Sequence, residues 1–329
     1  MTTHEARLDD APTVTPRVSA FMTVYNGDLW IEEAVRSVLD QSEPDFELIV
    51  IDDGSTDDTR KILESIIDPR IHLIHKENEG LGLPLNPWLR RCTGEYIMRL
   101  DGDDICDPER MRLQADFLDE HPDVVIVGCQ LHHFVEAGDT QTTTLPLGHK
   151  EILQGLRHGI HTVSHPTTMW RRSLLDDIDG YLWPGAGEDW SLLLEAARYG
   201  KLANLPGALY SRRLHPGSSS ASGGEQVLQG FAFARKRYEK FLEGEMDYTR
   251  EQYLQDVSNS PLDRFSLAAR SRSMSLHRDA QAARFSGNNA KGMVLLGAAA
   301  ILNPRTALGT LWKLRHHYAS QRQLRTPSG

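Results

Sequence analysis

Asp101, Asp103 and Asp104 directly follow an apolar stretch, Tyr96 to Leu100, that predicts a buried strand. In open α/β sheets, residues at the carboxyl ends of strands face the crevice in which ligands bind. Carboxylate oxygens this close together repel one another unless a cation neutralises them, and hard oxygen ligands suit Mg²⁺ or Mn²⁺. The stretch therefore predicts a divalent cation site that could bridge to phosphate oxygens.

A plain turn is the alternative interpretation, because Asp and Gly are common turn residues. An EF-hand loop fits badly, since Ile105 occupies the place of a third oxygen ligand and no glutamate closes the loop. The cation interpretation thus depends on the polar residues that the rest of the chain brings to the same place.

Alternating strands and helices would position these residues. We expect strands at residues 18–24, 46–51, 71–75 and 96–100, and later strands at 124–129, 131–135 and 208–214. Helices are expected after the first, second and fourth strands, and from Glu188 to about Tyr199. This alternation predicts right-handed crossovers and a mostly parallel sheet.

Polar side chains stand at the ends of the first, second and fourth strands, and a parallel sheet would place them along one edge. An aromatic ring and a buried carboxylate can bind a nucleobase, Asp101 can bond ribose hydroxyls, and Asp103 can hold a metal on a diphosphate. Gly80-Leu81-Gly82 does not form a Gly-x-Gly-x-x-Gly turn, so a dinucleotide fold is disfavoured. The residues of this predicted nucleotide site are Thr23, Tyr25, Asp52, Asp53, Asp101 and Asp103.

Composition limits the class of protein. A formal net charge of −10 over 329 residues argues against general nucleic-acid binding. The three cysteines are scattered without Cys-x-x-Cys spacing, which is typical of a reducing compartment and gives no zinc pattern. Residues 1–16 are polar and acidic without the apolar segment of a signal peptide, so we expect a disordered lead-in.

With these motifs in place, the chain resembles bacterial-type family 2 glycosyltransferases with the GT-A fold. The motifs occur in the family's order and are highly specific only together. They are Val18-Ser19-Ala20-Phe21-Met22-Thr23-Val24-Tyr25-Asn26, Asp52-Asp53-Gly54-Ser55-Thr56-Asp57, Asn78-Glu79-Gly80, Gly94-Glu95-Tyr96-Ile97, Leu100-Asp101-Gly102-Asp103-Asp104, Glu188-Asp189 and Tyr210-Ser211-Arg212-Arg213-Leu214-His215. The resemblance implies an α/β GT-A domain over residues 17–222, with a single mostly parallel Rossmann-like sheet flanked by helices, followed by a helical region at 223–329.

The resemblance also implies roles for individual residues. Asp189 would be the catalytic base, and Asp103 and His215 would hold Mn²⁺ or Mg²⁺. Arg213 would contact the diphosphate. Nucleotide contacts would come from Thr23, Tyr25, Asn26, Asp52, Asp53, Asp101 and Arg213.

One segment departs from the family's pattern. After Asn78-Glu79-Gly80 the family usually has a helix rich in Ala and Arg-Asn, whereas this chain has Leu83-Pro84-Leu85-Asn86-Pro87. A basic residue that contacts diphosphate is therefore missing there, and Arg90 or Arg91 could substitute for it.

Three further residues could form the acceptor side, and each has a structural alternative. Trp190 could stack on an acceptor sugar or could be a core residue at a helix start. His165 could line the acceptor site or be a hydrogen-bonded structural histidine. Glu188 could act beside Asp189, or both could be charges that favour a helix N-terminus.

The expected reaction is transfer of a sugar from a nucleotide-diphosphate donor, a UDP-sugar, to a hydroxyl of a glycan or lipid-linked acceptor. A metal offsets the charge of the leaving group, and a carboxylate takes the proton of the attacking hydroxyl. One direct displacement inverts the anomeric configuration. The alternatives are a catalytically silent nucleotide-sugar-binding protein and a nucleotidyltransferase, which would need a glycine- and lysine-rich phosphate loop that the N-terminal region lacks.

The C-terminal region carries no Asp or Glu after Asp279. Met293 to Leu302 is apolar but shorter than the ~20 residues that a spanning helix needs. Residues 308–315 form a basic amphipathic segment, which could be a helical cap or could bind an anionic membrane surface. We therefore expect a cytoplasmic protein, which in the second case would contact the cytoplasmic face of the membrane peripherally.

Overall fold

The computed structural model describes residues 15–135, 140–215, 224–261 and 289–302, together with single positions between 265 and 280. Two compact units make up the chain, Met1–Ser218 and Ser219–Gly329. Almost all of the predicted lead-in at residues 1–16, and the whole basic segment at 308–315, lie outside the described residues. Both predictions therefore stay untested.

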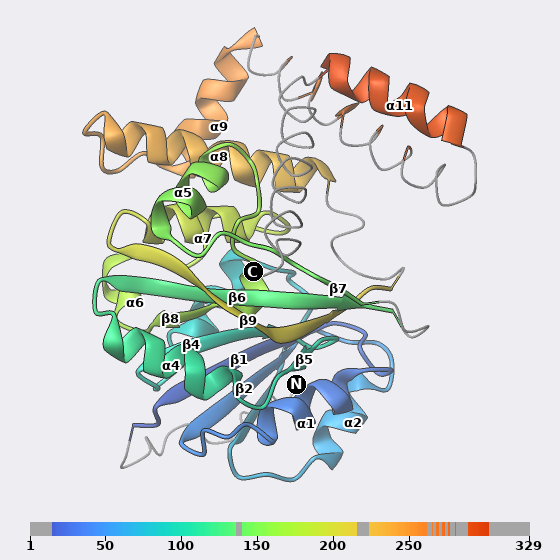
Figure 1. The fold of residues 1–329 in the computed structure, drawn as a ribbon, viewed down its shortest axis with the longest axis vertical. Coiled ribbons are helices and arrows are strands. Elements are labelled where there is room, and N and C mark those ends of the chain that lie inside the picture. The colour runs from blue at the N-terminus through green and yellow to red at the C-terminus, as the bar shows by residue number, and fades with distance from the viewer. Residues whose placement is uncertain are drawn as a thin grey trace, which may run out of the picture. The chain divides into compact units, whose positions relative to one another are not determined.

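Four parallel strands form the N-terminal half of the sheet in the first unit (Figure 1). β1 (Val18–Val24) lies between β2 (Phe46–Asp52) and β4 (Tyr96–Asp101), and β3 (Ile71–His75) pairs with β2. Every residue of β1 and β2 is buried, because strands in the middle of a parallel sheet are covered on both faces. The predicted alternation of strands and helices is confirmed in this half.

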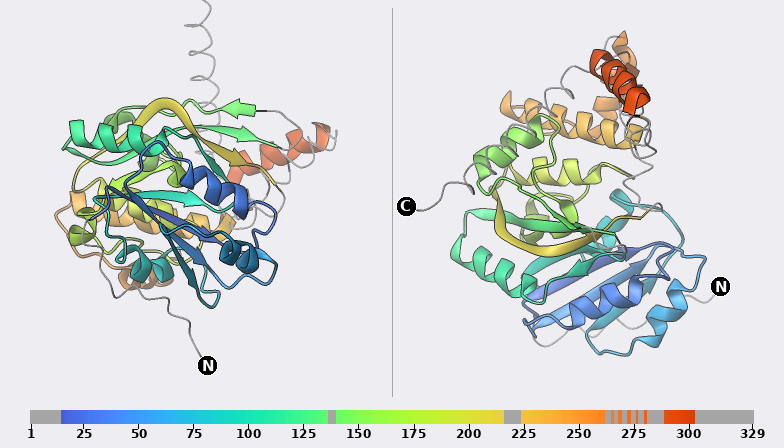
Figure 2. Two further views of the ribbon diagram at one scale, coloured as in Figure 1. Left: turned by 90° about the horizontal axis from the view of Figure 1, so that it is seen from below. Right: turned by 45° about the vertical axis from the view of Figure 1, so that its right-hand side comes forward.

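Helices α1 (Ile31–Leu39) and α2 (Thr59–Ser65) connect the first three strands and lie side by side in both views of Figure 2. The buried residues of α1 are spaced three or four apart, which gives the helix one apolar face toward the sheet. They are Ile31, Ala34, Val35 and Val38.

Beyond β4 the sheet continues with β8 (Met169–Arg171), β6 (Val124–Phe134), β9 (Lys201–Arg213) and β5 (Ile105–Cys106). A further strand, β7 (Thr140–Thr142), pairs with β6. The sheet as a whole is mixed, with four parallel and four antiparallel pairings. The expectation of a mostly parallel sheet thus holds only for the N-terminal half. Hydrophobic periodicity predicts where a strand lies but not its direction. The direction of β8, which pairs antiparallel with β4 and β6, could therefore not be predicted.

Two element boundaries also differ from expectation. The strands expected at 124–129 and 131–135 are one continuous strand, β6, whose pairing with β9 shifts register around Cys129 and Gln130. β9 begins at Lys201 rather than at Ala208. Irregular pairing of this kind weakens the alternating pattern that a sequence can reveal.

Helix α4 (Arg110–Glu120) is anchored by an arginine at its first residue. Arg110 is fully buried, and its Nη2 donates to the carbonyl oxygens of Arg99 at 2.8 Å and Pro166 at 3.0 Å. Its Nε donates to Gln114 at 3.0 Å. One side chain therefore joins α4 to strand β4 and to the segment before β8.

The remaining elements of the first unit are short helices and 3₁₀ turns. One of these helices, α7 (Glu188–Ala196), carries Asp189, the predicted catalytic base. The proline-containing segment that departs from the family's pattern forms the 3₁₀ turn η1 (Leu83–Leu85) and the short helix α3 (Asn86–Leu89). The others are α5 (His149–Arg157), the 3₁₀ turn η2 (His165–Thr167) and α6 (Leu174–Asp177).

The described part of the second unit is helical, as expected for residues 223–329. It contains α8 (Gly224–Leu242), α9 (Arg250–Asn259) and α11 (Asn289–Leu302). Thr249 and Gln252 form a capping box at the start of α9. No helix within the described ranges has the length and apolarity needed to cross a bilayer.

Candidate active site

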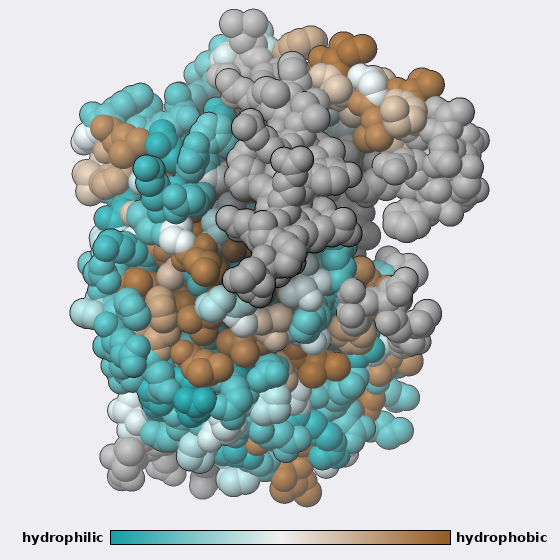
Figure 3. All heavy atoms as spheres, viewed as in Figure 1, coloured by the Kyte–Doolittle hydropathy of each residue, from teal (hydrophilic) through white to brown (hydrophobic). Residues whose placement is uncertain are grey.

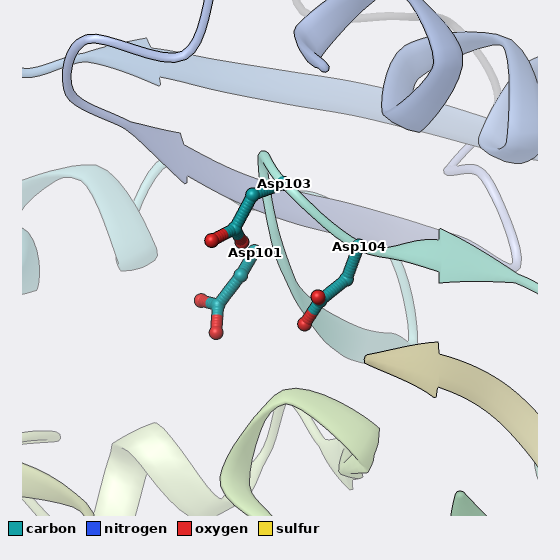
Figure 4. Close-up of side chains that lie close together, drawn as sticks. All are labelled: Asp101, Asp103 and Asp104. Carbon is teal, nitrogen blue, oxygen red and sulfur yellow. The ribbon is translucent and has the colours of Figure 1, made fainter. Parts of the chain in front are cut away.

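The acidic turn lies between β4 and β5 and carries Asp101, Asp103 and Asp104. Each aspartate offers an oxygen within 4.8 Å of the others, and Figure 4 shows their side chains leaving the turn on the same side. Gly102 allows the turn to pack against β1, because a Cβ there would lie 2.8 Å from Cβ of Val24. The sequence and the packing together place three carboxylates in one small volume.

Residues from the end of β9 hold this turn. Pairing of β5 with β9 brings Arg213 and His215 onto it from more than 100 residues away. Nε2 of His215 lies 3.0 Å from Oδ2 of Asp103, and the backbone N–H of Arg213 donates to Oδ1 of Asp104 at 2.8 Å. The ring of His215 also lies against Trp30, with 4.0 Å between ring centroids.

Burial and, after it, charge repulsion act on the most buried member of the cluster. Burial, followed by the neighbouring Asp103 and Asp101, raises the pKa of Asp104 to about 8. The three carboxylates are therefore not all ionised at neutral pH unless a positive charge joins them. An all-oxygen donor set with a nearby imidazole fits a hard divalent cation such as Mg²⁺ or Mn²⁺.

Arg99 organises the ends of β1 and β4. Its buried side chain pairs through Nη2 with Oδ1 of Asp101 at 2.7 Å and donates to Oγ1 of Thr23 at 2.8 Å. Thr23 and Asp101 stand opposite each other in the parallel pairing of their strands. Two predicted nucleotide contacts are thus brought together, and both already share one arginine.

Asn26 and Tyr25 lie in the loop after β1. Asn26 has a positive φ of 53°, and its Oδ1 accepts the backbone N–H of Thr56 at 2.8 Å. Its own N–H donates to Oγ of Ser55 at 2.9 Å, which ties this loop to the one after β2. Tyr25 is half exposed, so its ring is accessible at this edge of the sheet.

The carboxylates of Asp52 and Asp53 are buried and have partners within the protein. Oδ2 of Asp52 lies 2.9 Å from Nδ1 of His75. Asp53 accepts the backbone N–H groups of Glu79 at 3.0 Å and Gly80 at 2.9 Å, and it pairs with Lys76. Both residues lie at the expected sheet edge, where they shape the loops after β2 and β3.

The second part of the site is the start of α7. The backbone N–H of Trp190 donates to Oδ1 of Asp189 at 2.9 Å, and Oδ2 of Asp189 lies 3.6 Å from Nδ1 of His161. Glu188 is buried, and this burial, with Asp189 beside it, raises the pKa of Glu188 to about 8. The carboxyl group of Glu188 is therefore largely protonated at neutral pH.

His165 and Trp190 are enclosed by protein. Nε2 of His165 lies 2.9 Å from the hydroxyl of Tyr181, and burial, with Arg99 nearby, lowers the pKa of His165 to about 4. Trp190 is only 2% exposed, and its ring lies against His161 with 4.2 Å between centroids. In this conformation Trp190 presents no open face on which a sugar could stack.

His165 connects the two parts of the site electrostatically. Asp189 at the start of α7 and Asp101 on the acidic turn both act to raise the pKa of His165, although burial outweighs them. Asp101 and Arg99 likewise influence Glu188. The acidic turn and the start of α7 therefore both act electrostatically on His165.

The proline-rich departure from the family pattern has a structural role. The backbone N–H of Leu83 donates to the carbonyl of Trp183 at 3.3 Å, and that of Gly185 donates to Leu81 at 2.8 Å. Asn86 exchanges two further hydrogen bonds with the backbone of Tyr181. Residues 81–86 thus brace the loop that leads into Glu188 and Asp189.

The predicted diphosphate contacts are engaged elsewhere. Nη2 of Arg213 pairs with Glu33 at 2.5 Å, and its Nε donates to the carbonyl of Asp103 at 3.1 Å. Arg90 lies by Asp179, and Arg91 lies over the ring of Trp88. Arg213 therefore contacts the acidic turn through the carbonyl oxygen of Asp103 and the carboxylate of Asp104. Arg90 and Arg91 contact residues outside this turn.

Comparison with known proteins gives the family. Residues 19–179 match the model of glycosyl transferase family 2. An uncharacterized glycosyltransferase of Haemophilus influenzae is 33% identical over 227 residues, which are 63% of this chain and 68% of that relative. The chain belongs to glycosyl transferase family 2.

Other relatives in the family match over shorter spans. AmsE of Erwinia amylovora, an amylovoran biosynthesis glycosyltransferase, is 29% identical over 201 residues, 59% of this chain and 75% of AmsE. EpsE of Bacillus subtilis is 36% identical over 170 residues, and the chain spans 60% of its length.

Solved structures support the fold. TarS of S. aureus, residues 1–349 in complex with UDP-GlcNAc, gives a TM-score of 0.58 at 20% identity and covers 86% of this chain and 91% of its own. The mannosyltransferase PcManGT of Pyrobaculum calidifontis, in complex with GDP-Man and Mn²⁺, gives a TM-score of 0.51 at 19% identity. The match covers 95% of this chain and 84% of PcManGT. The predicted α/β GT-A class is therefore confirmed, with a mixed and curled sheet.

Several residues that shape the site escaped the sequence analysis. Arg99 was detectable, because it is a lone charge inside the apolar run of β4. Tyr210 accepts the backbone N–H of Asp101 at 3.1 Å, and its aromatic ring in a strand gave no specific signal. His161 and Glu33 lie in ordinary loop and helix positions, so nothing in their local sequence distinguishes them.

Proposed function

We propose that this family 2 member transfers a sugar from a nucleotide-diphosphate donor, a UDP-sugar, to a hydroxyl of a glycan or lipid-linked acceptor. The reaction would serve polysaccharide or glycoconjugate biosynthesis at the cell envelope, with inversion at the anomeric carbon. The observation that carries this proposal is the acidic turn held by His215 and Arg213, whose Asp101 acts electrostatically on the same His165 as Asp189 does.

The nucleoside would lie over the carboxyl ends of β1, β2 and β4. The half-exposed ring of Tyr25 would stack on the base, while Thr23 and Asp101, held by Arg99, would contact the sugar of the nucleotide. Asp52, Asp53 and Asn26 would define the loops around the base through the hydrogen bonds described above. Arg213 would stabilise the diphosphate end by fixing Asp103.

A divalent cation fits the acidic turn, with Asp103 and His215 as the residues that would hold it. When bound, Mn²⁺ or Mg²⁺ would offset the negative charge that develops on the departing nucleoside diphosphate. Ionisation of Asp104 would then become favourable, because a nearby cation lowers the pKa of a carboxyl group.

Asp189 would take the proton of the attacking hydroxyl. The acceptor oxygen attacks the anomeric carbon as its O–H bond breaks, and the bond to the diphosphate breaks on the opposite face. Glu188, kept neutral by burial, is a weaker candidate for this role. Glu188, Trp190 and His165 would support the acceptor side from behind Asp189, since all three are buried.

Similar proteins support a nucleotide-sugar donor and a divalent cation. TarS binds UDP-GlcNAc and PcManGT binds GDP-Man with Mn²⁺, so both uridine and guanosine donors occur on this fold. AmsE acts in amylovoran biosynthesis, which supports a polysaccharide or glycoconjugate product. A catalytically silent nucleotide-sugar-binding protein is the alternative function.

We assign the catalytic domain to residues 17–222 and propose that residues 223–329 contact an anionic membrane surface from the cytoplasm. Met293, Val294 and Ile301 on α11 are exposed, and Figure 3 shows a hydrophobic surface over this helix. Seven Lys and Arg residues and no acidic residue follow Asp279, which suits anionic lipid headgroups.

The test is nucleotide release from a panel of UDP- and GDP-sugars with Mn²⁺, in which water takes the place of the acceptor hydroxyl, using wild type and Asp189→Asn. One donor should be turned over, and Asp189→Asn should lower kcat by about 10²- to 10⁴-fold while UDP still binds. Asp179→Asn is the matched control, because Asp179 is exposed at the surface. Donor binding without any turnover by wild type would support the silent alternative.

A further inference from the structure

His161 is a residue beside the base to which neither the motifs nor the proposed function gives a role. It lies between α5 and η2, and its side chain is about half exposed. Its Nδ1 lies 3.6 Å from Oδ2 of Asp189, and its ring is tilted against the buried ring of Trp190 with 4.2 Å between centroids.

A carboxylate that acts as a base must have a fixed orientation as well as a fixed position. Oδ1 of Asp189 accepts the backbone N–H of Trp190, the next residue on α7. That bond restrains one oxygen only. The second oxygen faces the imidazole of His161, so the direction of the carboxylate depends on this contact. A supporting hydrogen bond commonly orients a catalytic base in this way.

We propose that His161 is the positioning residue of the base, donating its Nδ1–H to Oδ2 of Asp189 and so aiming the carboxylate at the acceptor hydroxyl. The proposal rests on the proposed function, because it assigns a partner to the base of that reaction. The distance of 3.6 Å is slightly longer than a hydrogen bond, and such contacts often shorten when substrates bind.

The contact with Trp190 gives the imidazole a fixed plane. Trp190 is buried in α7 and therefore rigid, and an aromatic neighbour restricts the rotation of a half-exposed ring. His161 thus contacts two consecutive residues of α7, Asp189 through Nδ1 and Trp190 through its tilted ring. A ring held this way can present Nδ1 in a single direction, which a freely rotating surface histidine could not.

Two substitutions of His161 separate the hydrogen-bond donor from the rest of the ring. His161→Asn would place an amide nitrogen near the position of Nδ1, whereas His161→Ala would remove the donor. We therefore expect His161→Asn to keep kcat within about threefold of wild type, and His161→Ala to lower kcat by about 10- to 100-fold with the KM for the donor unchanged. Thermal unfolding of both variants controls for loss of fold. Wild-type kcat in His161→Ala would overturn the proposal, and so would an equal loss in His161→Asn.

A substrate-free measurement tests the contact itself. Two-bond ¹H–¹⁵N correlation spectra of protein labelled at histidine, with the His161 signal assigned from His161→Asn, report which ring nitrogen carries the proton. The proposal predicts the Nδ1–H tautomer in wild type and the Nε2–H tautomer in Asp189→Ala. An Nε2–H tautomer in wild type would overturn it. This result is independent of turnover, so failure to find a donor would count against the proposed function and not against the contact.

Discussion

Nε2 of His215 lies 3.0 Å from Oδ2 of Asp103, although 112 residues separate them in the chain. The antiparallel pairing of β5 with β9 makes this contact, because it carries the end of β9 past the acidic turn. A histidine and a carboxylate that meet in this way would offer a cation two ligands of suitable chemistry from two distant segments of the chain.

Removal of the Asp103 carboxylate should weaken metal-dependent nucleotide binding. We expect Asp103→Asn to lower the affinity for UDP in the presence of Mn²⁺ by at least about 100-fold, and His215→Asn by about 10-fold. Isothermal titration calorimetry with UDP, with and without Mn²⁺, measures both. His158→Asn is a control at an exposed histidine outside the site. Unchanged affinity in Asp103→Asn would refute its role in the metal site.

Gly82 should be essential to the loop that leads into Asp189. Its φ is +80°, and an added Cβ would lie 2.1 Å from the carbonyl oxygen of Trp183. We expect Gly82→Ala to destabilise the fold by about 2–4 kcal/mol and to reduce turnover, because residues 81–86 could no longer brace this loop.

Gly80 provides the matched control for this experiment. It has the same φ of +80°, yet nothing lies within 4 Å of an added Cβ. Gly80→Ala should therefore cost only the backbone strain, about 1 kcal/mol. Equal losses in the two variants, measured by chemical denaturation, would show that the contact with Trp183 does not matter.

Protonation of His165 should lower the free energy of unfolding in acid. The pKa of His165 is lowered to about 4 in the folded protein by burial, against about 6.5 in an unfolded chain. The unfolded state binds the proton first, so stability is fully present above about pH 6.5 and is lost progressively toward pH 4. Between pH 7 and pH 5 the loss from this residue should be about 1–2 kcal/mol.

The comparison variant is His165→Gln, whose amide can still reach the hydroxyl of Tyr181. Urea unfolding at pH 7 and pH 5 should show a smaller decrease for His165→Gln than for wild type. An identical decrease would mean that His165 is not the group that titrates.

Membrane contact should depend on α11. We expect wild type to sediment with phosphatidylcholine vesicles that contain phosphatidylglycerol, and less with vesicles of phosphatidylcholine alone. Replacement of Met293, Val294 and Ile301 by serine should reduce sedimentation, whereas Ile67→Ser, at an exposed apolar residue of the first unit, should not. Truncation after Asp279 should abolish it, and equal sedimentation of the truncated chain would end the membrane proposal.

Sequence reasoning worked where a residue's neighbours in the chain decide its environment. Strands β1, β2 and β4 were predictable because their apolar runs are buried, and the acidic turn was predictable because its carboxylates are adjacent in sequence. The direction of β8 and the full length of β6 and β9 were not, since strand pairing depends on partners far away.

The same distinction applies to side chains in the site. The pairing of Arg213 with Glu33 and the burial of Trp190 depend on tertiary packing, so the motif alone pointed to diphosphate and sugar contacts. Arg99 could have been anticipated as a charge on a buried strand, but its two partners, Thr23 and Asp101, become apparent only from the pairing of β1 with β4.

In the proposed function, the acidic turn and Asp189 serve one reaction site. The most direct test of this claim is a crystal structure of the chain grown with Mn²⁺ and UDP, with the ion located by anomalous scattering at the manganese edge. We predict an ion bonded to Asp103 and to a phosphate oxygen of UDP, with Asp189 facing the space beyond the diphosphate. An ion bound elsewhere, or UDP bound away from the ends of β1 and β4, would contradict the account.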